Sequence, residues 1–579
     1  VLVIIGFISC TISLFAQQDA AVIGMVRDSK TKEPLPGVTV MVDGMGGTTT
    51  NESGKYDLTL QPGEHALTFR FVGYNLEQKK IMLKEKEARI INIDLLPLTT
   101  ELGTVVVSAG KFEQKIEEVT VSMAVLTPTL IENTNATSLD EALEHVPGVT
   151  IVDGQANIRG GSGFSYGAGS RVLMLVDDLP MLAADANDVK WSFIPVENLE
   201  QVEVIKGASS ALYGSAAMNG IINIRTAYPK ATPETKVTLF GGMYDSPKNI
   251  AYKWWGNEKQ MSQGISASHN RKIGNFDLVT GLNYFKDEGY RMGENEEHIR
   301  VNANTRYSFK NKLQGLSIGA NTNYMHTEGG LFLLWQDDST GALIPQGGLD
   351  SGTTISLYTT KRFNIDPFIT YVSKNGETHK IRTRFFKTDN KNNTNQQSFA
   401  KAYYGEYQFQ KRFSENFTWT WGFCDLYSDV ESELYGDHLS NNVGLYTQAD
   451  AKWNKWTFSF GARWEQNRID TVKGEFTPVF RYGINYALFD DTHLRASYGQ
   501  GYRFPSIAEK FVKTRVGDIV IYPNDSIQPE TGFSAEIGIN QGFKISGWKG
   551  SLDVAGFWSE YKDMMEFSFG LYGNPFVDP

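Results

Sequence analysis

The chain has 579 residues, and its 55 basic and 66 acidic side chains give it a formal net charge of -11. This acidic balance argues against a nucleic-acid partner, which would need a basic face. The two cysteines, Cys10 and Cys424, are too few for a disulfide framework or a cysteine-based metal site. The length predicts two or three domains.

An apolar run opens the chain. Residues 1–17, VLVIIGFISCTISLFAQ, are predicted to be the core of a signal peptide, incomplete at its start, because the run is too short to span a bilayer and ends at small Ala16. No later run reaches the about 18 apolar residues of a transmembrane helix. The chain is instead rich in aromatic residues and glycine, with 34 Phe, 26 Tyr, 11 Trp and 56 Gly. A secreted chain of this kind is either a soluble all-β protein or a membrane β-barrel.

Short strands separated by turn residues fill residues 18–98. The segments AVIGMVRD, GVTVMVDG, GKYDLTL and EHALTFRF alternate with turn chemistry at Asn51–Gly54 and Pro62–Gly63. This spacing predicts a small β-sandwich. No His-x-x-Glu or His-Glu-x-x-His pattern occurs here, so a zinc peptidase is not expected.

Two different segments follow the predicted sandwich, a short junction and a mixed domain. Residues 99–111 form a junction that contains the β-branched run TVVVS, which could add as an edge strand to a partner sheet or serve as a seventh strand of the sandwich. Residues 112–228 mix both element types and predict an α+β domain. Ser138 and Glu141 form a capping-box pattern ahead of a helix that Pro147–Gly148 should end.

Long alternating segments follow over residues 233–579. In WTFSFGARWE, Trp456, Phe458, Phe460 and Trp464 share one face, and the opposite face carries Arg463 and Glu465. The two tryptophans are about 27 Å apart along a strand. In a strand tilted by about 40° this gives roughly 20 Å of height, which suits a membrane barrel. A charged inner face suits a wet lumen rather than a sandwich core.

A small-residue segment lies between two apolar strands, over residues 207–217. The surrounding sequence NLEQVEVIKGASSALYGSAAMNGIINIRT resembles the plug hallmark of TonB-dependent outer-membrane receptors. LDEALEHVPGVTI, IRG and VLMLVDDLPM are similar to the plug segments that precede it, and ASYGQGYRFPSIAEKF and SIQPETGFSAEIGI are similar to barrel signatures. Residues 18–98 resemble the carboxypeptidase-regulatory-like domain. The expected fold is therefore mainly β: an N-terminal β-sandwich, an α+β plug domain and a transmembrane antiparallel β-barrel of the 22-stranded type.

The resemblance implies a function and its partners. It implies TonB-dependent import of a scarce solute, such as a siderophore, cobalamin, haem or a metal complex, across the outer membrane, with the sandwich in the periplasm. No enzyme activity and no cofactor are expected. The expected partners are TonB, a small-molecule or metal-chelate ligand, outer-membrane lipid and, as an option, a surface lipoprotein. The resemblance also assigns a TonB box to Thr104, Val105, Val106, Val107, Ser108 and Ala109.

Three alternatives stay open: a glycan importer of the starch-utilisation type, a surface receptor with a signalling role, and an adhesin or enzyme on a barrel anchor. Lys206 is followed by Gly207, whereas glycan importers usually read KDAS there, and this favours a smaller ligand. No catalytic constellation supports an anchored enzyme.

The ligand contacts are predicted from strand direction. If residues 149–152 run outward, the next turn is apical, the glycine-rich residues 160–170 are periplasmic, and residues 172–176 run outward again. The ligand-binding candidates are then Asp153, Gln155, Asp177, Asp178, Asp185, Asn187 and Asp188.

Three structural expectations complete the prediction. Residues 104–109 should be extended and packed into neither neighbouring domain. The segment from Glu203 to Arg225 should lie inside the barrel, with residues 207–217 tightly packed. About fifteen long strands are counted after residue 235, against the 22 of plugged transporters, so we expect a fragment truncated at both ends, with an open sheet edge at the last strand.

Overall fold

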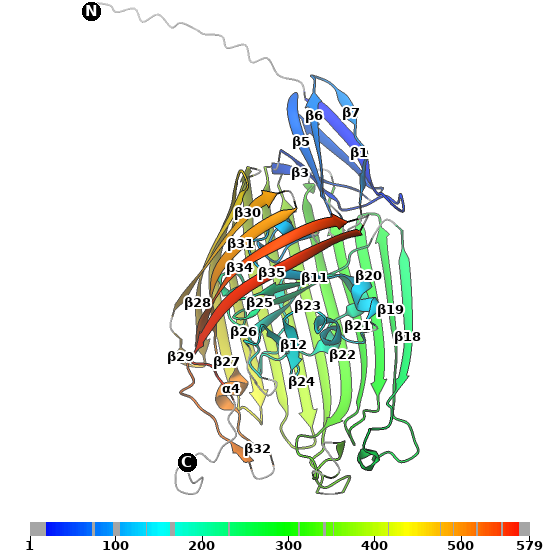
Figure 1. Ribbon diagram of the computed structural model, residues 1–579, viewed down its shortest axis with the longest axis vertical. Helices are drawn as coiled ribbons and strands as arrows, with labels where there is room; N and C mark the ends of the chain where they lie inside the picture. Colours follow the sequence, from blue (N-terminus) through cyan, green and yellow to red (C-terminus); the bar gives the residue numbers. More distant parts are fainter. Residues whose placement is uncertain are drawn as a thin grey trace, which may run out of the picture.

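The computed structural model has three parts, a small sandwich, a barrel-shaped sheet and a domain inside it (Figure 1). It describes residues 19–566 except for 44, 52, 72–73, 75, 97–104, 135, 162–167, 230–231, 311–312, 338, 340–342, 351, 374, 415, 475, 490, 517–518 and 546–547. The predicted signal peptide and Thr104 lie outside these residues. Within the part described, no helix is long and apolar enough to cross a membrane.

The N-terminal part is the predicted β-sandwich. One sheet joins β1 (Ala20–Asp28) to β4 (Lys55–Leu60), β7 (Ala88–Ile90) and β8 (Ile93–Leu95). The other has the order β3-β2-β5-β6, made of β2 (Thr39–Val42), β3 (Met45–Thr49), β5 (Gly63–Arg70) and β6 (Glu77–Leu83). Alternate residues such as Val22, Val40 and Phe69 are fully buried between the sheets. This packing of two inner faces supplies the core of the sandwich.

The internal domain is the predicted α+β unit. Its central sheet has the order β11-β16-β17-β14-β15, built from β11 (Met123–Leu126), β14 (Val172–Val176), β15 (Leu179–Pro180), β16 (Leu199–Lys206) and β17 (Gly220–Thr226). Around it lie the β9–β10 pair (Val105–Val106 and Gln114–Lys115), the β12–β13 hairpin (Val149–Val152 and Gln155–Ile158), and the helices η2 (Ile116–Glu118), α1 (Pro128–Asn133), α2 (Leu139–Leu143), η3 (Trp191–Phe193), η4 (Val196–Asn198) and α3 (Ser210–Tyr213).

The capping box predicted for α2 forms only in part. The Glu141 carboxylate accepts the Thr137 backbone N–H at 2.7 Å, one residue earlier than expected. The Ser138 hydroxyl donates to Asp140 instead of accepting a backbone N–H. The helix is also shorter than expected and ends at Leu143.

A long antiparallel sheet curves around this domain (Figure 1). Fifteen strands follow one another in the hydrogen-bonded order, and β29 (Val472–Lys473) pairs with β28 beside that path. The fifteen are β18 (Glu234–Met243), β19 (Met261–Ile273), β20 (Phe276–Asp287), β21 (Glu296–Ser308), β22 (Leu316–Leu331), β23 (Ser356–Val372), β24 (Glu377–Asn392), β25 (Ser398–Ser414), β26 (Phe417–Ser432), β27 (His438–Trp453), β28 (Trp456–Ile469), β30 (Thr477–Phe489), β31 (Thr492–Arg503), β34 (Glu530–Ile545) and β35 (Trp548–Lys562). The strand count is confirmed. Strands β18 and β35 are the ends of the path, and no pairing joins them in the described residues, so the sheet has the expected open edge.

The barrel wall is polar inside and apolar outside. On β28, Trp456, Phe458 and Phe460 are each more than a third exposed, whereas Arg463 and Glu465 are buried at 4 % and 2 %. Soluble proteins bury their apolar faces, so this inverted pattern requires an apolar surrounding. The predicted choice of a membrane barrel over a soluble sandwich is therefore confirmed.

The two ends of the barrel differ. At one end neighbouring strands are joined by short turns, such as residues 274–275 and 454–455. At the opposite end they are joined by longer connections, such as residues 244–260 and 288–295; these connections include η5 (Ile250–Tyr252), α4 (Ile507–Phe511), β32 (Thr514–Val516) and β33 (Ile519–Ile521). The sandwich lies against the short-turn end (Figure 1), where Gln314 Nε2 donates to Thr48 Oγ1 at 3.1 Å. We call these the short-turn end and the long-loop end.

Candidate functional site: the plug inside the barrel

The small-residue segment packs against the barrel wall without space to spare. In α3, Ser210, Ala211 and Leu212 have no exposed surface. A Cβ on Gly461 of β28 would lie 3.7 Å from the Ala211 Cβ, and one on Gly499 of β31 would lie 2.5 Å from the Ala208 carbonyl oxygen. Small residues on both sides thus allow the plug backbone to approach the wall. The prediction that residues 207–217 pack tightly inside the barrel is confirmed.

We expect Ala211→Trp to destabilise this contact by about 1–3 kcal/mol, because the added ring has no free volume to enter. Thermal unfolding of the purified chain measures the effect. The control is Ala251→Trp, at an exposed position of the 244–260 connection, which should leave the melting temperature unchanged. Equal melting temperatures for Ala211→Trp and the unmodified chain would contradict the packing argument.

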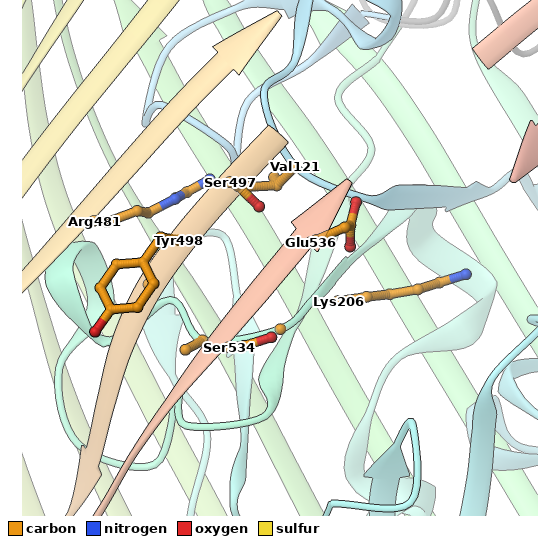
Figure 2. A pocket seen from close by; sticks show the side chains of 10 residues that line it. Val121, Lys206, Arg481, Ser497, Tyr498, Ser534 and Glu536 are labelled. Atoms are coloured by element: carbon orange, nitrogen blue, oxygen red, sulfur yellow. The ribbon is translucent and has the colours of Figure 1, made fainter. Parts of the chain in front are cut away.

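A small pocket lies where the plug meets β30, β31 and β34 (Figure 2). Figure 2 shows Arg481, Tyr498 and Glu536 on the barrel strands and Lys206 on the plug. The pocket has a volume of 10 Å³, which suits about one water molecule. A nutrient needs a pocket of a few hundred Å³, so this space is part of the plug–wall interface and not a binding site.

The segment predicted as a TonB box is packed into the plug. Val106, Val107, Ser108 and Ala109 are all at most 4 % exposed. The backbone N–H groups of Val107 and Ser108 donate to the Glu203 carboxylate, at 3.1 and 2.7 Å. The prediction that residues 104–109 pack into neither neighbour is therefore wrong for the described part. A run of β-branched residues fits a buried strand as well as an exposed one, so the sequence pattern does not distinguish the two.

Further contacts hold the same segment. The Tyr213 hydroxyl donates to the Ser108 carbonyl oxygen at 2.8 Å, and Asn223 Nδ2 donates to the Ser108 hydroxyl at 2.9 Å. Val105 and Val106 pair with Gln114 and Lys115, so this run forms a short pair of its own rather than a seventh strand of the sandwich.

A chain of buried charges continues from this segment into the wall. Lys111 Nζ lies 2.5 Å from a Glu406 carboxylate oxygen, and Arg382 lies 2.9 Å from the other oxygen of Glu406 and 2.5 Å from Asp178. Arg225 completes the group at 2.9 Å from Asp178. Burial lowers the pKa of Lys111, although Glu406 opposes the shift. Burial raises the pKa of Asp178, but Arg225 and Arg382 outweigh it and hold the pKa below its usual range. The plug is thus joined to β24 and β25 by paired charges.

Two of the predicted ligand residues lie at the opposite end from the one expected. Asp178 is 3 % exposed and pairs with Arg382, near the start of β24 at the short-turn end. Asp177 accepts from Thr226 at 2.6 Å and from Asn321 on β22 at 3.1 Å. The reason is that β14, parallel to β17, runs toward the short-turn end. The prediction that the turn after it is apical is wrong, because alternation fixes a strand's faces and not its direction.

The last part of the glycine-rich segment also lies at the opposite end of the barrel from the one predicted, again because strand direction was not known. A Cβ on Gly169 would lie 2.1 Å from Glu509 of α4, so the end of the segment lies at the long-loop end. The prediction that residues 160–170 lie at the periplasmic end is therefore wrong for this part. Residues 162–167 lie outside the described residues.

The remaining acidic candidates do gather at the long-loop end. The Asp185 carboxylate accepts from Ser398, the first residue of β25, at 2.7 Å, and its carbonyl oxygen accepts the Ala508 N–H of α4. The Asp188 carboxylate lies 3.7 Å from Arg362. Burial raises the pKa of Asp188, although Arg362 opposes the shift. Asn187 has a positive φ of 51°, and its N–H closes the turn onto the Ala183 carbonyl oxygen.

The hairpin candidates are split between surface and interior. Asp153 is exposed at the β12–β13 turn, whereas Gln155 is 4 % exposed. The Gly154 carbonyl oxygen accepts from the Trp191 indole at 2.8 Å, and the neighbouring Lys190 pairs with Glu296, the first residue of β21. The turn therefore lies toward the long-loop end, as expected. Ligand binding by any of these residues stays a prediction.

The sequence prediction missed one fully buried link between plug and wall. Glu530, at the start of β34, accepts from Arg171 of the plug and from Arg503 of β31, with all three side chains at most 1 % exposed. Arg503 also contacts Glu509 of α4 at 2.8 Å. Both Glu530 and Arg503 lie in the two quoted barrel signatures. In the sequence, Arg503 and Glu530 each stand beside apolar strand positions. This was the available signal of a plug–wall contact, because a buried charge requires a partner.

A domain that fills the polar lumen of an antiparallel barrel with an apolar exterior defines the class of plugged outer-membrane β-barrels. Family comparison agrees. The model described as TonB dependent receptor-like, beta-barrel matches residues 238–577, the TonB-dependent receptor plug domain matches residues 115–221, and the CarboxypepD_reg-like domain matches residues 22–107. The barrel match alone covers more than half of the chain, and the chain belongs to the TonB-dependent receptor family.

Individual relatives agree with this assignment. A vitamin B12 transporter of Vibrio cholerae serotype O1 is 25 % identical over 463 residues, which cover 76 % of this chain and 69 % of the relative. The TonB-dependent receptor SusC of Bacteroides thetaiotaomicron is 28 % identical over 335 residues, covering 55 % and 31 %.

Solved structures match in fold. The alcaligin outer-membrane receptor of Bordetella pertussis aligns with a TM-score of 0.58 at 13 % identity, covering 80 % of this chain and 74 % of that chain. The siderophore receptor PirA of Acinetobacter baumannii gives 0.60 at 15 % identity, covering 76 % and 71 %. The protein is therefore an outer-membrane β-barrel receptor that imports a ligand with TonB, and it is not an enzyme.

Proposed function

We propose that the chain imports a scarce solute of the siderophore, cobalamin, haem or metal-complex type, and that ligand binding gates the plug. The observation that carries this proposal is the enclosure of residues 106–109 inside a plug that is itself joined to the barrel by buried charges. A coupling segment held in this way is available to a partner only after the plug rearranges. Relatives named as vitamin B12 transporters and neighbours titled as siderophore receptors support the ligand class.

In this proposal the sandwich lies in the periplasm, because it adjoins the short-turn end, where outer-membrane barrels have their periplasmic turns. TonB binds residues 104–109 as an added strand, lipid surrounds the apolar wall, and a surface lipoprotein is an optional partner at the long-loop end. The domain boundaries proposed are 18–98 for the sandwich, 99–111 for the box and linker, 112–228 for the plug and 233–579 for the barrel.

A glycan importer is the second candidate, favoured by the SusC likeness. The test is uptake by cells that lack other receptors for the solutes offered. Radiolabelled cobalamin, ferric siderophores and maltoheptaose are supplied separately to cells that express the receptor. Accumulation of maltoheptaose alone would replace our proposal with the second candidate.

The role of the box leads to a separate prediction. Val106→Pro should abolish uptake of the accumulated solute and leave surface binding intact, because proline removes the N–H that an added strand donates. Val106→Ala, which keeps the N–H, is the matched control and should retain most uptake. Uptake that persists in Val106→Pro would show that this segment is not the coupling strand.

A further inference from the structure

An aromatic pocket lies among three connections at the long-loop end. Four rings line it, Tyr244, Tyr252, Trp255 and Tyr290, together with Asp245, Pro247 and Leu343. These residues come from the connections that follow β18, β20 and β22. The cavity has a volume of 460 Å³, which lies in the range of small-molecule sites.

The pocket is held together by contacts between the three connections. Trp254 Nε1 donates to the Tyr290 carbonyl oxygen at 2.8 Å, which joins the first connection to the second. The Met292 N–H donates to the Leu343 carbonyl oxygen at 2.8 Å, which joins the second to the third. The ring centroids of Tyr244 and Tyr290 lie 5.7 Å apart.

One ring is fixed by a hydrogen bond, and another is fixed by its neighbour. The Tyr244 hydroxyl donates to Asp287 at 2.7 Å, so its O–H is not available as a donor to a ligand. Trp255 is 8 % exposed and makes an edge contact with Trp254 at 5.6 Å. Two of the four rings, Tyr244 and Trp255, are therefore held in place without a ligand.

The lining limits the chemistry of the occupant. A phosphate would lose hydration against walls that are mostly aromatic and aliphatic, and the Asp245 carboxylate would repel it. A flat aromatic ring instead stacks on the tyrosine and tryptophan faces. Asp245 is the carboxylate of the lining. Its Oδ1 accepts the Ser246 backbone N–H at 2.8 Å, and its other oxygen can accept a hydrogen bond from a ring N–H or O–H.

We propose that this aromatic pocket binds a planar aromatic or heteroaromatic group of the imported solute, with Asp245 accepting its N–H or O–H. The proposal rests on the import function for its biological meaning and deepens it by naming a substrate class. The pocket is separate from the plug candidates, which lie in the lumen.

The test uses 5-fluoroindole, a planar ring with one N–H donor, and the full chain in lipid nanodiscs. Binding is measured by fluorine NMR as broadening and shift of the probe signal. We expect saturable binding that Leu343→Trp, which fills the cavity, and Tyr252→Leu, which removes a ring, each weaken by about tenfold or more. Trp335→Leu is the control, because Trp335 is 51 % exposed and does not line the pocket.

Equal binding by the unmodified chain and by Leu343→Trp would overturn the proposal. Displacement of the probe by glucose would also overturn it, because the pocket would then accept a sugar ring. The measurement needs neither TonB nor uptake. Failure of the transport proposal would leave saturable 5-fluoroindole binding in place, and failure of the pocket proposal would leave uptake in place, so the two results are distinguishable.

Discussion

Glu530→Gln should lower the unfolding free energy by about 3–5 kcal/mol, the cost of breaking a buried charge pair by removing one partner. Glu530 holds Arg171 of the plug and Arg503 of β31, and these guanidinium groups are 1 % and 0 % exposed. The amide keeps the shape of the carboxylate but has no charge and one acceptor oxygen. Two cations then remain buried without their shared counter-charge.

The measurement is the unfolding temperature of the purified chain in nanodiscs. Glu431→Gln is the matched control, because Glu431 pairs with Lys401 at 3.5 Å on the surface with 60 % of its side chain exposed. A surface pair of this kind contributes at most about 1 kcal/mol. If both substitutions cost the same, Glu530 does not anchor the plug.

Glu203→Ala should expose residues 107–109, which belong to the proposed coupling segment. The Val107 and Ser108 N–H groups lose their acceptor inside the plug, and an unsatisfied buried donor costs about 1–3 kcal/mol. With two such donors the packed arrangement is disfavoured by at least about 2 kcal/mol, which corresponds to about a tenfold or larger rise in the open population. A cysteine at Ala109, which is 4 % exposed, reports this opening through its rate of maleimide labelling.

We expect Ala109→Cys to label slowly alone and about ten times faster or more with Glu203→Ala. Glu234→Ala, which removes an exposed carboxylate at the start of β18, should not change the rate. An unchanged rate in the Glu203→Ala background would mean that Tyr213 and Asn223 hold the segment without Glu203.

The barrel could be predicted from sequence because long strands such as β28 have one apolar and one polar face. Trp456 and Phe458 on one face and Arg463 and Glu465 on the other give a period of two over a length that sandwich strands do not reach. The tight packing around Ala211 was also predictable, because a run of positions without large side chains is explained by close packing.

The rest depends on information that no local pattern contains. Asp177 and Asp178 lie at the short-turn end because β14 pairs in parallel with β17, and parallel pairing is a property of the whole sheet. Glu203 is the acceptor for Val107 and Ser108 although about a hundred residues separate them. The aromatic pocket joins three connections that only the barrel register brings together. The sequence predicts which elements form, and these contacts depend on how they assemble.

The order of strands in the plug has a mechanical consequence. Strand β11 is the first strand of the central sheet after residues 105–109, and it is an edge strand joined to β16 by four residue pairs. A load applied at the box first meets the Lys111 and Glu118 ion pairs and then reaches Met123, where β11 can peel from the edge one pair at a time. Peeling breaks bonds in succession, each worth about 1 kcal/mol, so it needs far less force than shearing the whole sheet. If force is applied at residues 104–109, as proposed, β16, β17 and β14 would stay in the lumen during the first step, and a passage would open along the side of the plug that β11 leaves.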